Sequence, residues 1–257
     1  MLWRALSGVA RGFYIDVGAG DPDRHTVTRA FYERGWSGVN VEPDPAVFRL
    51  LPLQRERDVN LPVALSDVPG ERRLHIPSVP GLATLDSGVA FQHRLRGIGV
   101  RRIRVAVRTL AEICRQHAPT DIHFLKIDVE GAEEQVLRGA DFAAFRPWIV
   151  LAESTFPMTQ RETHAAWEPL LLAAGYRFVW FDGLNRFYVA QERHAALAPH
   201  FRLPPNCFDR FRLADPEAEA MAAKLQRVTA ALQAATAERD ALRARLAALP
   251  AGPAEAG

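Results

Sequence analysis

The chain has 257 residues, of which 48% are hydrophobic and 24% are charged, a composition typical of a folded globular protein and not of a disordered or fibrous one. Its length fits one α/β domain with a substantial appendage. The formal net charge of +2 is too small to indicate a nucleic-acid-binding protein, and no apolar run approaches the roughly 20 residues that span a bilayer.

The N-terminal segment predicts the location of the protein, and the two cysteines show no disulfide or metal-site pattern. Arg4 and Arg11 interrupt the N-terminus before the apolar core of a signal peptide develops, so we expect a cytoplasmic protein. Cys114 and Cys207 are too few for a disulfide framework and too far apart in sequence for a CxxC metal site. Both are expected to be plain thiols.

The first segment with a clear pattern predicts a βαβ unit. An apolar run at residues 13–17 leads into the glycines of the sequence DVGAG, as in a strand followed by a tight loop. The Asp–Pro pair at residues 21–22 is a helix-start signal, because Asp caps free N–H groups and Pro loses no hydrogen bond there. A second strand follows at residues 37–42, and another Asp–Pro pair at 44–45 would start the next helix.

Strands and helices continue to alternate through the rest of the body. The pattern predicts strands at residues 59–65, 122–128, 148–153, 176–181 and 186–190, and helices at 131–138 and 167–174. Residues 69–109 form an insertion in which Ile103, Val105 and Val107 alternate with polar neighbours, which predicts a hairpin or a small β-extension. Such alternation implies an α/β fold with a mostly parallel sheet and helices on both faces.

The DVGAG loop and the carboxylate at the end of the next strand predict a cofactor site. Glycines let the backbone approach a ligand closely, and Glu42 can accept hydrogen bonds from both hydroxyls of a ribose. A nicotinamide dinucleotide would need a third glycine where Asp23 stands, and Asp16 and Asp21 would repel a pyrophosphate but attract a cationic sulfonium. The alternative is an ordinary strand-to-helix turn with a capping aspartate.

A second group of carboxylates lies in the sequence LKIDVEGAEEQVLRG, residues 125–139. Asp128 follows the predicted fourth strand, at the edge where open α/β sheets bind their ligands. Glu130 and Glu133 open the next helix, where carboxylates also stabilise the helix dipole, and this plainer explanation accounts poorly for Asp128. Lys126 alternates with Asp128 on one side of the strand, so we expect the two to form an ion pair.

Four segments in this order resemble the FkbM-type family of S-adenosylmethionine-dependent methyltransferases: GFYIDVGAGDP, VNVEPDP, LKIDVEGAEEQVLRG and FDGLNRFYV. The resemblance covers roughly residues 12–190. It implies a class I, Rossmann-like methyltransferase sheet with a reversed last strand, and S-adenosylmethionine as cofactor. Many members are similar to O-methyltransferases that act on sugars, cell-surface glycans or natural products.

The family pattern also implies roles for individual residues. The DVGAG loop would hold the methionine and ribose end of the cofactor, Glu42 its ribose hydroxyls, and the Ser66–Asp67 turn would lie near adenine. At Gly20 the chain departs from the pattern, since many members carry Asn there. The expected cofactor-binding residues are Asp16, Gly18, Gly20, Asp21, Glu42, Ser66 and Asp67.

Methyl transfer to a sugar hydroxyl needs a base or a metal ion, because the hydroxyl is barely acidic. Asp128 is the first candidate for the catalytic residue, followed by Glu130, Glu133 and Glu153. Glu153 ends the predicted fifth strand beside Asp128, where it could contact the acceptor, bind a metal or simply cap the strand. A divalent metal ion suits such carboxylates, although no His-carboxylate cluster in the sequence demands one.

The insertion contains the densest basic cluster of the chain, which suggests either a solvated strand face or a site for an anionic acceptor such as a nucleotide-sugar or acidic glycan. The cluster consists of Arg94, Arg96, Arg101, Arg102 and Arg104. The solvated strand face is the plainer explanation, so the cluster by itself assigns no acceptor.

From residue 196 the composition changes. Residues 196–214 form a Pro-rich connector, a long helix is predicted over 215–250, and residues 251–257 are expected to be disordered. Positions spaced by alternating fours and threes predict a coiled-coil seam that Arg239 interrupts once. These positions are Met221, Leu225, Val228, Leu232, Ala235, Arg239, Leu242, Leu246 and Leu249.

The sequence thus predicts a methyltransferase domain over residues 1–195, acting on a glycan or small-molecule acceptor, and a tail that forms a homo-oligomer or recruits a partner protein. The tail helix could instead fold back on its own domain. A natural-product O- or N-methyltransferase is an alternative activity. From a different class, the domain could be a non-catalytic cofactor-binding scaffold, which the intact glycine loop and carboxylates argue against.

Overall fold

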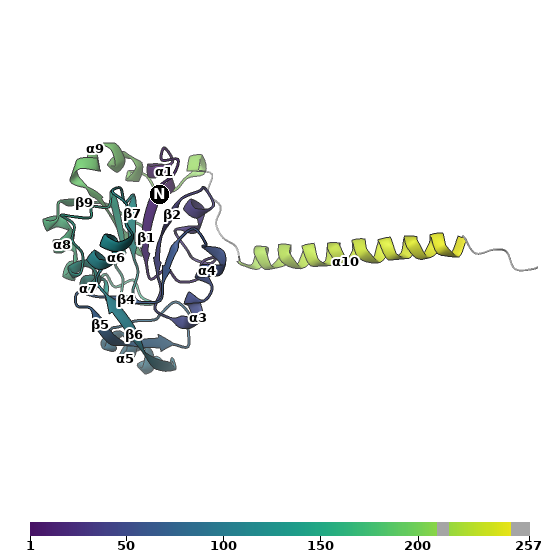
Figure 1. Cartoon of the computed structure of the whole chain (residues 1–257), viewed down its shortest axis with the longest axis horizontal. Coiled ribbons are helices and arrows are strands. Elements are labelled where there is room, and N and C mark those ends of the chain that lie inside the picture. The colour runs from purple at the N-terminus through teal and green to yellow at the C-terminus, as the bar shows by residue number, and fades with distance from the viewer. Residues whose placement is uncertain (210–215, 248–257) are drawn as a thin grey trace, which may run out of the picture. The chain divides into compact units, whose positions relative to one another are not determined.

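The computed structural model describes residues 1–209 and 216–247 of the chain (Figure 1). The fold divides into two compact units, residues 1–205 and residues 206–257. We call the first unit the body. In the described part of the chain, no helix is long and apolar enough to cross a membrane.

The body is built on a seven-stranded sheet in the order β3-β2-β1-β7-β8-β10-β9. Only β10 runs antiparallel to its two neighbours, and the other pairs are parallel. This order with one reversed strand confirms the Rossmann-like methyltransferase sheet. The strands are β1 (Phe13–Val17), β2 (Ser37–Val41), β3 (Val59–Leu61), β7 (Phe124–Ile127), β8 (Ile149–Glu153), β9 (Tyr176–Phe181) and β10 (Asn185–Ala190).

Helices cover both faces of this sheet, as predicted. Alternate strand residues point to opposite faces, so Ile15 joins one buried apolar cluster with α6, α7 and α8, whereas Tyr14 joins a second cluster with α1 and α2. The helices of the body are α1 (Leu2–Leu6), α2 (Arg29–Tyr32), α3 (Pro45–Phe48), α4 (Leu51–Gln54), α5 (Ser87–Leu95), α6 (Leu110–His117), α7 (Glu133–Arg138), α8 (Glu168–Ala173) and α9 (His194–Leu197).

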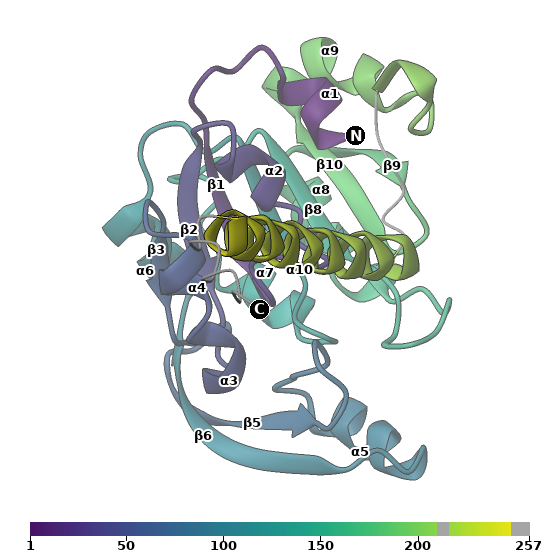
Figure 2. The same ribbon diagram turned by 90° about the vertical axis from the view of Figure 1, so that its right-hand side faces the viewer.

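The insertion forms a small second sheet, which confirms the predicted β-extension. The insertion supplies β5 (Gly70–Pro77) and β6 (Val100–Arg108), and β4 (Ala64–Leu65), which precedes the insertion, completes the sheet in the order β4-β6-β5. β5 and β6 pair antiparallel along eight residues, and α5 lies between them in sequence, capped by Asp86. In Figure 2 this sheet lies below the main sheet, with α5 at its far end.

The strand predicted over residues 59–65 is two strands in different sheets. β3 pairs with β2 in the main sheet and β4 pairs with β6 in the small sheet. Pro62 lies between them and has no N–H to continue a ladder. The chain therefore passes from one sheet to the other at this point.

The helix predicted to begin at residues 21–22 begins at Arg29 instead. Asp21 does cap free N–H groups, but its Oδ1 accepts from Asp23 and Arg24 within an irregular loop. His25 has a φ of 55°, a left-handed conformation that a right-handed helix cannot contain. At Asp44 the same signal works as predicted, because the side chain accepts from Ala46 and α3 starts at once.

The body extends past the predicted boundary at residue 195. Leu197 and Phe201 are buried in the second apolar cluster, so the first part of the predicted connector packs onto the body. The predicted boundary at 214–215, Leu249 and Pro250, and the predicted disordered residues 251–257 lie outside the described residues.

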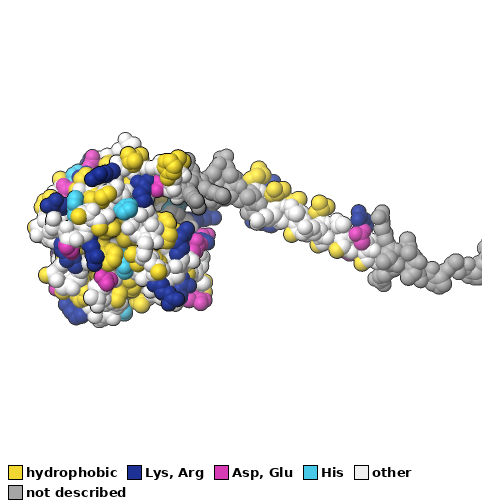
Figure 3. Space-filling view, turned by 90° about the horizontal axis from the view of Figure 1, so that it is seen from above, with side chains coloured by type: hydrophobic (Ala, Val, Ile, Leu, Met, Phe, Trp, Pro, Cys, Tyr) yellow, Lys and Arg dark blue, Asp and Glu magenta, His cyan; other side chains and the backbone are white. Residues whose placement is uncertain are grey.

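The second unit contains α10 (Pro216–Ala247), a helix of 32 residues that agrees with the predicted long helix. Four seam residues, Met221, Leu225, Val228 and Leu232, are 57–66% exposed, and apolar side chains are visible along this helix in Figure 3. The coiled coil itself stays a prediction, since one chain presents only one side of such a seam.

Candidate functional site

A cavity of about 800 Å³ opens where β1, β2 and β7 end. This is the edge at which open α/β sheets bind ligands, and the volume is typical of a small-molecule site. The lining comes from residues 17–21, 41–44, 63–65 and 128–130, and the small sheet adds residues of β5 and β6. The insertion is therefore a wall of the site.

The glycines of the DVGAG loop have different roles. Gly18 has a φ of +75°, and a Cβ there would lie 1.8 Å from the carbonyl oxygen of Asp128. Gly20 has a φ of +64°, and a Cβ there would meet nothing within 4 Å. Gly18 is thus needed for backbone packing against the loop after β7, whereas Gly20 lines open space in the cavity.

Glu42 ties the glycine loop to the start of α3. Its Oε2 accepts from the N–H of Gly20 at 2.9 Å and its Oε1 from the N–H of Asp44 at 2.8 Å. A carboxylate has about four lone-pair sites, so each oxygen can still accept a bond from a ligand in the cavity. Burial raises the pKa of Glu42 to about 7.

Lys126 joins the loop after β1 to the loop after β7. Its Nζ donates to the carbonyl oxygen of Gly18 at 2.7 Å and lies 3.1 Å from Asp16 Oδ1 and 3.4 Å from Asp128 Oδ2. Burial lowers the pKa of Lys126, but the two carboxylates outweigh burial and hold it above its ordinary value. The predicted pair with Asp128 is present, although the contact with Asp16 is shorter.

Asp16 itself lies behind the loop and does not line the cavity. It is buried, and its Oδ2 accepts from the hydroxyl of Thr28 at 3.2 Å. Burial raises the pKa of Asp16, and Lys126 offsets part of that shift. Asp21, in contrast, lines the cavity. The structure therefore places Asp16 where it supports the loop through Lys126.

Ser66 and Asp67 also lie outside the cavity lining. The N–H of Ser66 donates to the carbonyl oxygen of Arg108, and its hydroxyl donates to Asp67 Oδ1 at 2.9 Å. The switch between sheets at Pro62 carries this turn onto the ladder of the small sheet. The wall on this side consists of Val63, Ala64 and Leu65, which sequence reasoning did not select.

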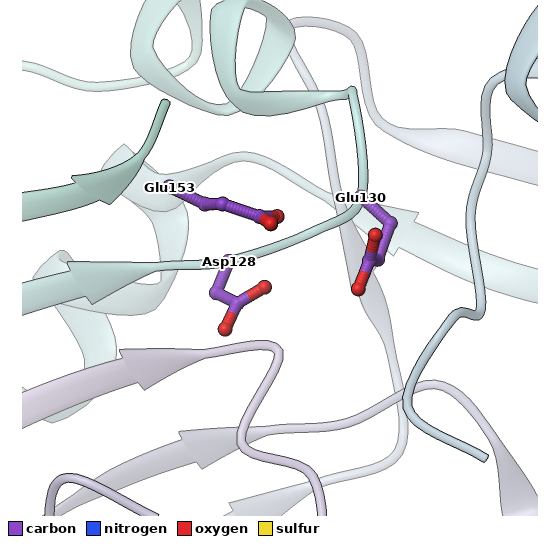
Figure 4. A group of neighbouring side chains, drawn as sticks. All are labelled: Asp128, Glu130 and Glu153. Carbon is purple, nitrogen blue, oxygen red and sulfur yellow. The ribbon is translucent and has the colours of Figure 1, made fainter. Parts of the chain in front are cut away.

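Three of the four predicted catalytic carboxylates come together at the other end of the cavity. Asp128 follows β7, Glu130 lies in the loop before α7, and Glu153 ends β8; one oxygen of each lies within 4.8 Å of the others (Figure 4). Asp128 and Glu130 line the cavity, and Asp128 is the most exposed of the three. We call Asp128, Glu130 and Glu153 the carboxylate cluster.

Burial and mutual repulsion act together on this cluster. Burial first, and then the charges of neighbouring carboxylates, raise the pKa values of Glu130 and Glu153 well above the ordinary glutamate value. Like charges this close cannot all stay ionised in a buried site without a compensating group.

Glu133 is separate from the cluster in its contacts. Its Oε1 accepts from the N–H groups of Val129 and Gly131, both at 3.1 Å, so it fastens the loop that carries Glu130. The hydroxyl of Thr84, from the insertion, donates to the carbonyl oxygen of Glu130 at 2.8 Å. These bonds hold Glu130 in a left-handed conformation with a φ of 56°. We therefore treat Glu133 as a positioning residue.

A second hollow of about 640 Å³ lies on the other side of this loop. Glu133 lines it, together with polar residues of α5 and of the segment after β8. Arg96 donates to the carbonyl oxygen of Pro157 at 3.2 Å and closes the insertion onto that segment. Arg161 also lines the hollow. Sequence reasoning noted Arg96 only as part of a basic cluster and missed Arg161.

One further contact spans the main cavity. Arg101 of β6 lies 3.1 Å from Asp44 Oδ1 at the start of α3, and both residues line the cavity. The ion pair therefore ties the small sheet to the loop after β2. The sequence alone does not predict this contact, because it depends on where the insertion lies in the fold.

Comparison with known proteins identifies the family. The model of the methyltransferase FkbM domain matches residues 16–178. No curated protein matches the sequence. Among solved structures, a TehB-like SAM-dependent methyltransferase from Corynebacterium glutamicum is similar, with a TM-score of 0.40 and 10% identity over 74% of this chain and 86% of that one. The matched domain contains the glycine loop, Glu42 and the carboxylate cluster, and the chain belongs to the FkbM family of S-adenosylmethionine-dependent methyltransferases.

Proposed function

We propose that the protein transfers a methyl group from S-adenosylmethionine to a hydroxyl group of a sugar or cell-surface glycan. The observation that carries this proposal is the position of Asp128. Asp128 lines the cavity together with the glycine loop, and its carboxylate lies within 4.8 Å of those of Glu130 and Glu153. A hydroxyl that reaches the methyl group from this side meets a base.

The residues at the glycine end of the cavity fit the cofactor. Gly20 borders open space that a side chain would occupy, Glu42 keeps lone pairs for ribose hydroxyls, and residues 63–65 offer an apolar wall to an adenine ring. We therefore assign Gly20, Asp21 and Glu42 to direct contact. Gly18 and Asp16 would act by shaping and supporting the loop.

When bound, S-adenosylmethionine supplies a sulfonium-linked methyl group as the electrophile. Asp128 is placed to take the proton of an acceptor hydroxyl whose oxygen would bond to that methyl carbon as the sulfur–carbon bond breaks and S-adenosylhomocysteine leaves. Lys126 holds Asp128 through Oδ2, which orients the carboxylate. Correct alignment of the two reacting groups contributes about 7 kcal/mol or more relative to an encounter in solution.

The second hollow supports a polar acceptor. Gln92, Thr159 and Arg161 line it within reach of the loop that carries Glu130. Such side chains suit an acceptor with many hydroxyls, and the arginine adds a preference for an anionic substituent. A cytoplasmic location, predicted from the sequence, would make nucleotide-linked or lipid-linked sugar precursors the accessible acceptors.

The proposal can be tested with a labelled cofactor and a panel of acceptors. Neutral sugars, acidic sugars and the matching sugars with one hydroxyl replaced by hydrogen should be offered separately. Turnover on a hydroxylated sugar that disappears with one deoxy analogue would identify the methylated position. Turnover only on amines would contradict the proposal, and cofactor binding with no turnover on any acceptor would favour the scaffold alternative.

A further inference from the structure

The carboxylate cluster has more negative charge than the surrounding protein compensates. Lys126 reaches only Asp128 in the cluster, and it also holds Asp16 and the carbonyl oxygen of Gly18. No ion pair joins Glu130 or Glu153 to a basic side chain in the part of the chain that the structure describes. Three carboxylates that lie within 4.8 Å of one another therefore share one lysine.

Two oxygens of the cluster are buried without any partner. Glu130 is 8% exposed and Glu153 is 5% exposed, and the Oε2 atom of each has no hydrogen bond. Unpartnered buried carboxylate oxygens are rare because desolvation of a charge costs several kcal/mol. Figure 4 shows both side chains directed toward the space beside Asp128. A group that binds these oxygens would offset this desolvation cost.

The donor set determines what kind of group fits. All three side chains offer carboxylate oxygens, and the described residues contribute no histidine or cysteine to the cluster. Oxygen-only donors suit hard cations such as Mg²⁺, Mn²⁺ or Ca²⁺ and do not suit Zn²⁺ or copper. Lys126 contacts Oδ2 of Asp128, which leaves Oδ1 for such an ion.

We propose that Asp128, Glu130 and Glu153 bind one hard divalent cation at the acceptor end of the cavity. The site is formed in advance, because Glu133 and Thr84 fasten the loop that carries Glu130. Three protein ligands leave coordination positions for water or an acceptor. A cation here would also lower the pKa of a bound hydroxyl, and this last role rests on the proposed function.

Metal binding can be measured without any acceptor or cofactor. The full-length protein is treated with EDTA, dialysed and titrated with Mn²⁺ while electron paramagnetic resonance follows the free ion. One Mn²⁺ should bind per chain, and Mg²⁺ should displace it. Glu153→Gln and Glu130→Gln should each weaken binding about tenfold or more. Glu56→Gln, at an exposed position outside the lining of both cavities, is the matched control and should bind as the parent does.

Thermal unfolding provides the second measurement and shows whether the variants fold. In EDTA, Glu153→Gln should melt no lower than the parent, because the neutral amide replaces a buried carboxyl whose ionisation its neighbours oppose. Mn²⁺ should then raise the Tm of the parent but not that of the variant. The same EDTA result with no Mn²⁺ binding by the parent would show that protons alone compensate the cluster, and it would overturn the proposal.

The two proposals fail in different ways. Parental binding of Mn²⁺ by both cluster variants would overturn the metal site. Methyl transfer that continues in EDTA would remove the cation from the reaction while leaving the proposed activity intact. One bound Mn²⁺ with no turnover on any hydroxylated acceptor would instead uphold the metal site and contradict the proposed function.

Discussion

The carboxylates at the two ends of the main cavity differ in their hydrogen bonding. At the glycine end, both oxygens of Glu42 accept backbone N–H bonds. At the acceptor end, Glu130 and Glu153 each keep a buried oxygen without a partner. At the glycine end the protein itself supplies partners for both carboxylate oxygens. At the acceptor end a proton, a cation or an acceptor must supply the missing partner. Cofactor binding and chemistry should therefore respond to different substitutions.

The sharpest test of this division is Asp128→Asn. We expect methyl transfer to fall by about 10²–10⁴-fold, because the amide cannot take the hydroxyl proton. Cofactor affinity should stay within about threefold, since its predicted contacts lie at the other end. Rates with labelled cofactor and calorimetric titration with S-adenosylhomocysteine measure the two quantities.

Asp121→Asn is the matched control for that experiment. Asp121 is exposed and precedes β7, whereas Asp128 follows it, so the control changes the same side chain at the opposite edge of the sheet. Parental turnover by Asp128→Asn would remove this residue from the mechanism. A large loss of cofactor affinity would show that the two ends are not separable.

The ends meet at Gly18, and its substitution should disturb both. A Cβ at this position would lie 1.8 Å from the carbonyl oxygen of Asp128, so we expect Gly18→Ala to lower the free energy of unfolding by about 3 kcal/mol or more. Gly20→Ala carries only the cost of its left-handed backbone, about 1–2 kcal/mol. Urea unfolding of both variants compares them, and equal losses would contradict our distinction between the glycines.

Glu42→Gln should affect only the cofactor. The neutral amide keeps one acceptor oxygen but loses the charge, so we expect affinity for S-adenosylhomocysteine to fall about tenfold. Titration calorimetry gives the affinity, with Glu56→Gln as the control. Mn²⁺ binding by the cluster should not change. An unaltered affinity would mean that Glu42 serves the loop and does not contact the ribose.

The raised pKa of Glu42 predicts a pH dependence that this variant should lack. Because burial raises the pKa to about 7, the carboxyl is protonated below neutral pH and accepts fewer hydrogen bonds from ribose. Cofactor affinity should therefore rise as pH increases through 7, by up to about tenfold per pH unit on the acidic side. Titrations at pH 6, 7 and 8 measure it, and an identical slope in Glu42→Gln would assign the effect elsewhere.

The contribution of Glu42 to the stability of the fold should fall as pH rises, whereas cofactor affinity should increase. The folded-state pKa exceeds the ordinary value of 4.5, so the folded protein binds more protons between pH 4.5 and 7 than the unfolded chain does. The contribution of Glu42 to stability is therefore full below pH 4.5 and is lost as pH rises through 7. Melting curves of the parent and Glu42→Gln without ligand provide this check.

Removal of α10 is expected to have the smallest effect on ligand binding. A chain that ends at Asp209 keeps the three apolar clusters of the body, so cofactor affinity and Mn²⁺ binding should be unchanged. The full chain should dimerise in a concentration-dependent manner through its exposed seam, and the shortened chain should be monomeric by light scattering. A shortened chain that unfolds would place the apolar seam against the body, and one that still dimerises would place the dimer interface in the body.

The strands of this fold and the residues at their ends could be predicted because buried strands have recognisable sequence patterns. Glu42, Asp128 and Glu153 were selected because each ends a predicted parallel strand, and parallel strands end at one edge. The switch of sheets at residues 59–65 had a visible signal in Pro62. The capping box of Thr109 and Glu112 likewise marks the start of α6.

Other features depend on tertiary contacts that no local pattern contains. The left-handed backbone of His25, which delays α2, follows from the path of the loop. Sequence could not show that Glu133 turns back to the N–H groups of its own loop while Glu130 and Glu153 face each other. Nor could the sequence show that Asp16 contacts Lys126 from outside the cavity lining, because a side chain at the end of a strand can point toward the cavity or away from it.

The insertion has a consequence for how such enzymes diversify. β5 and β6 pair with each other over eight residues and have their own apolar cluster, which includes Leu74 and Val105. The main sheet is continuous without them, yet they wall the cavity and α5 lines the second hollow. Mutations in this segment can accumulate without breaking the main-sheet ladder whose strand ends carry the glycine loop, Glu42 and Asp128. Acceptor preference can therefore evolve in the insertion while the methyl donor stays the same.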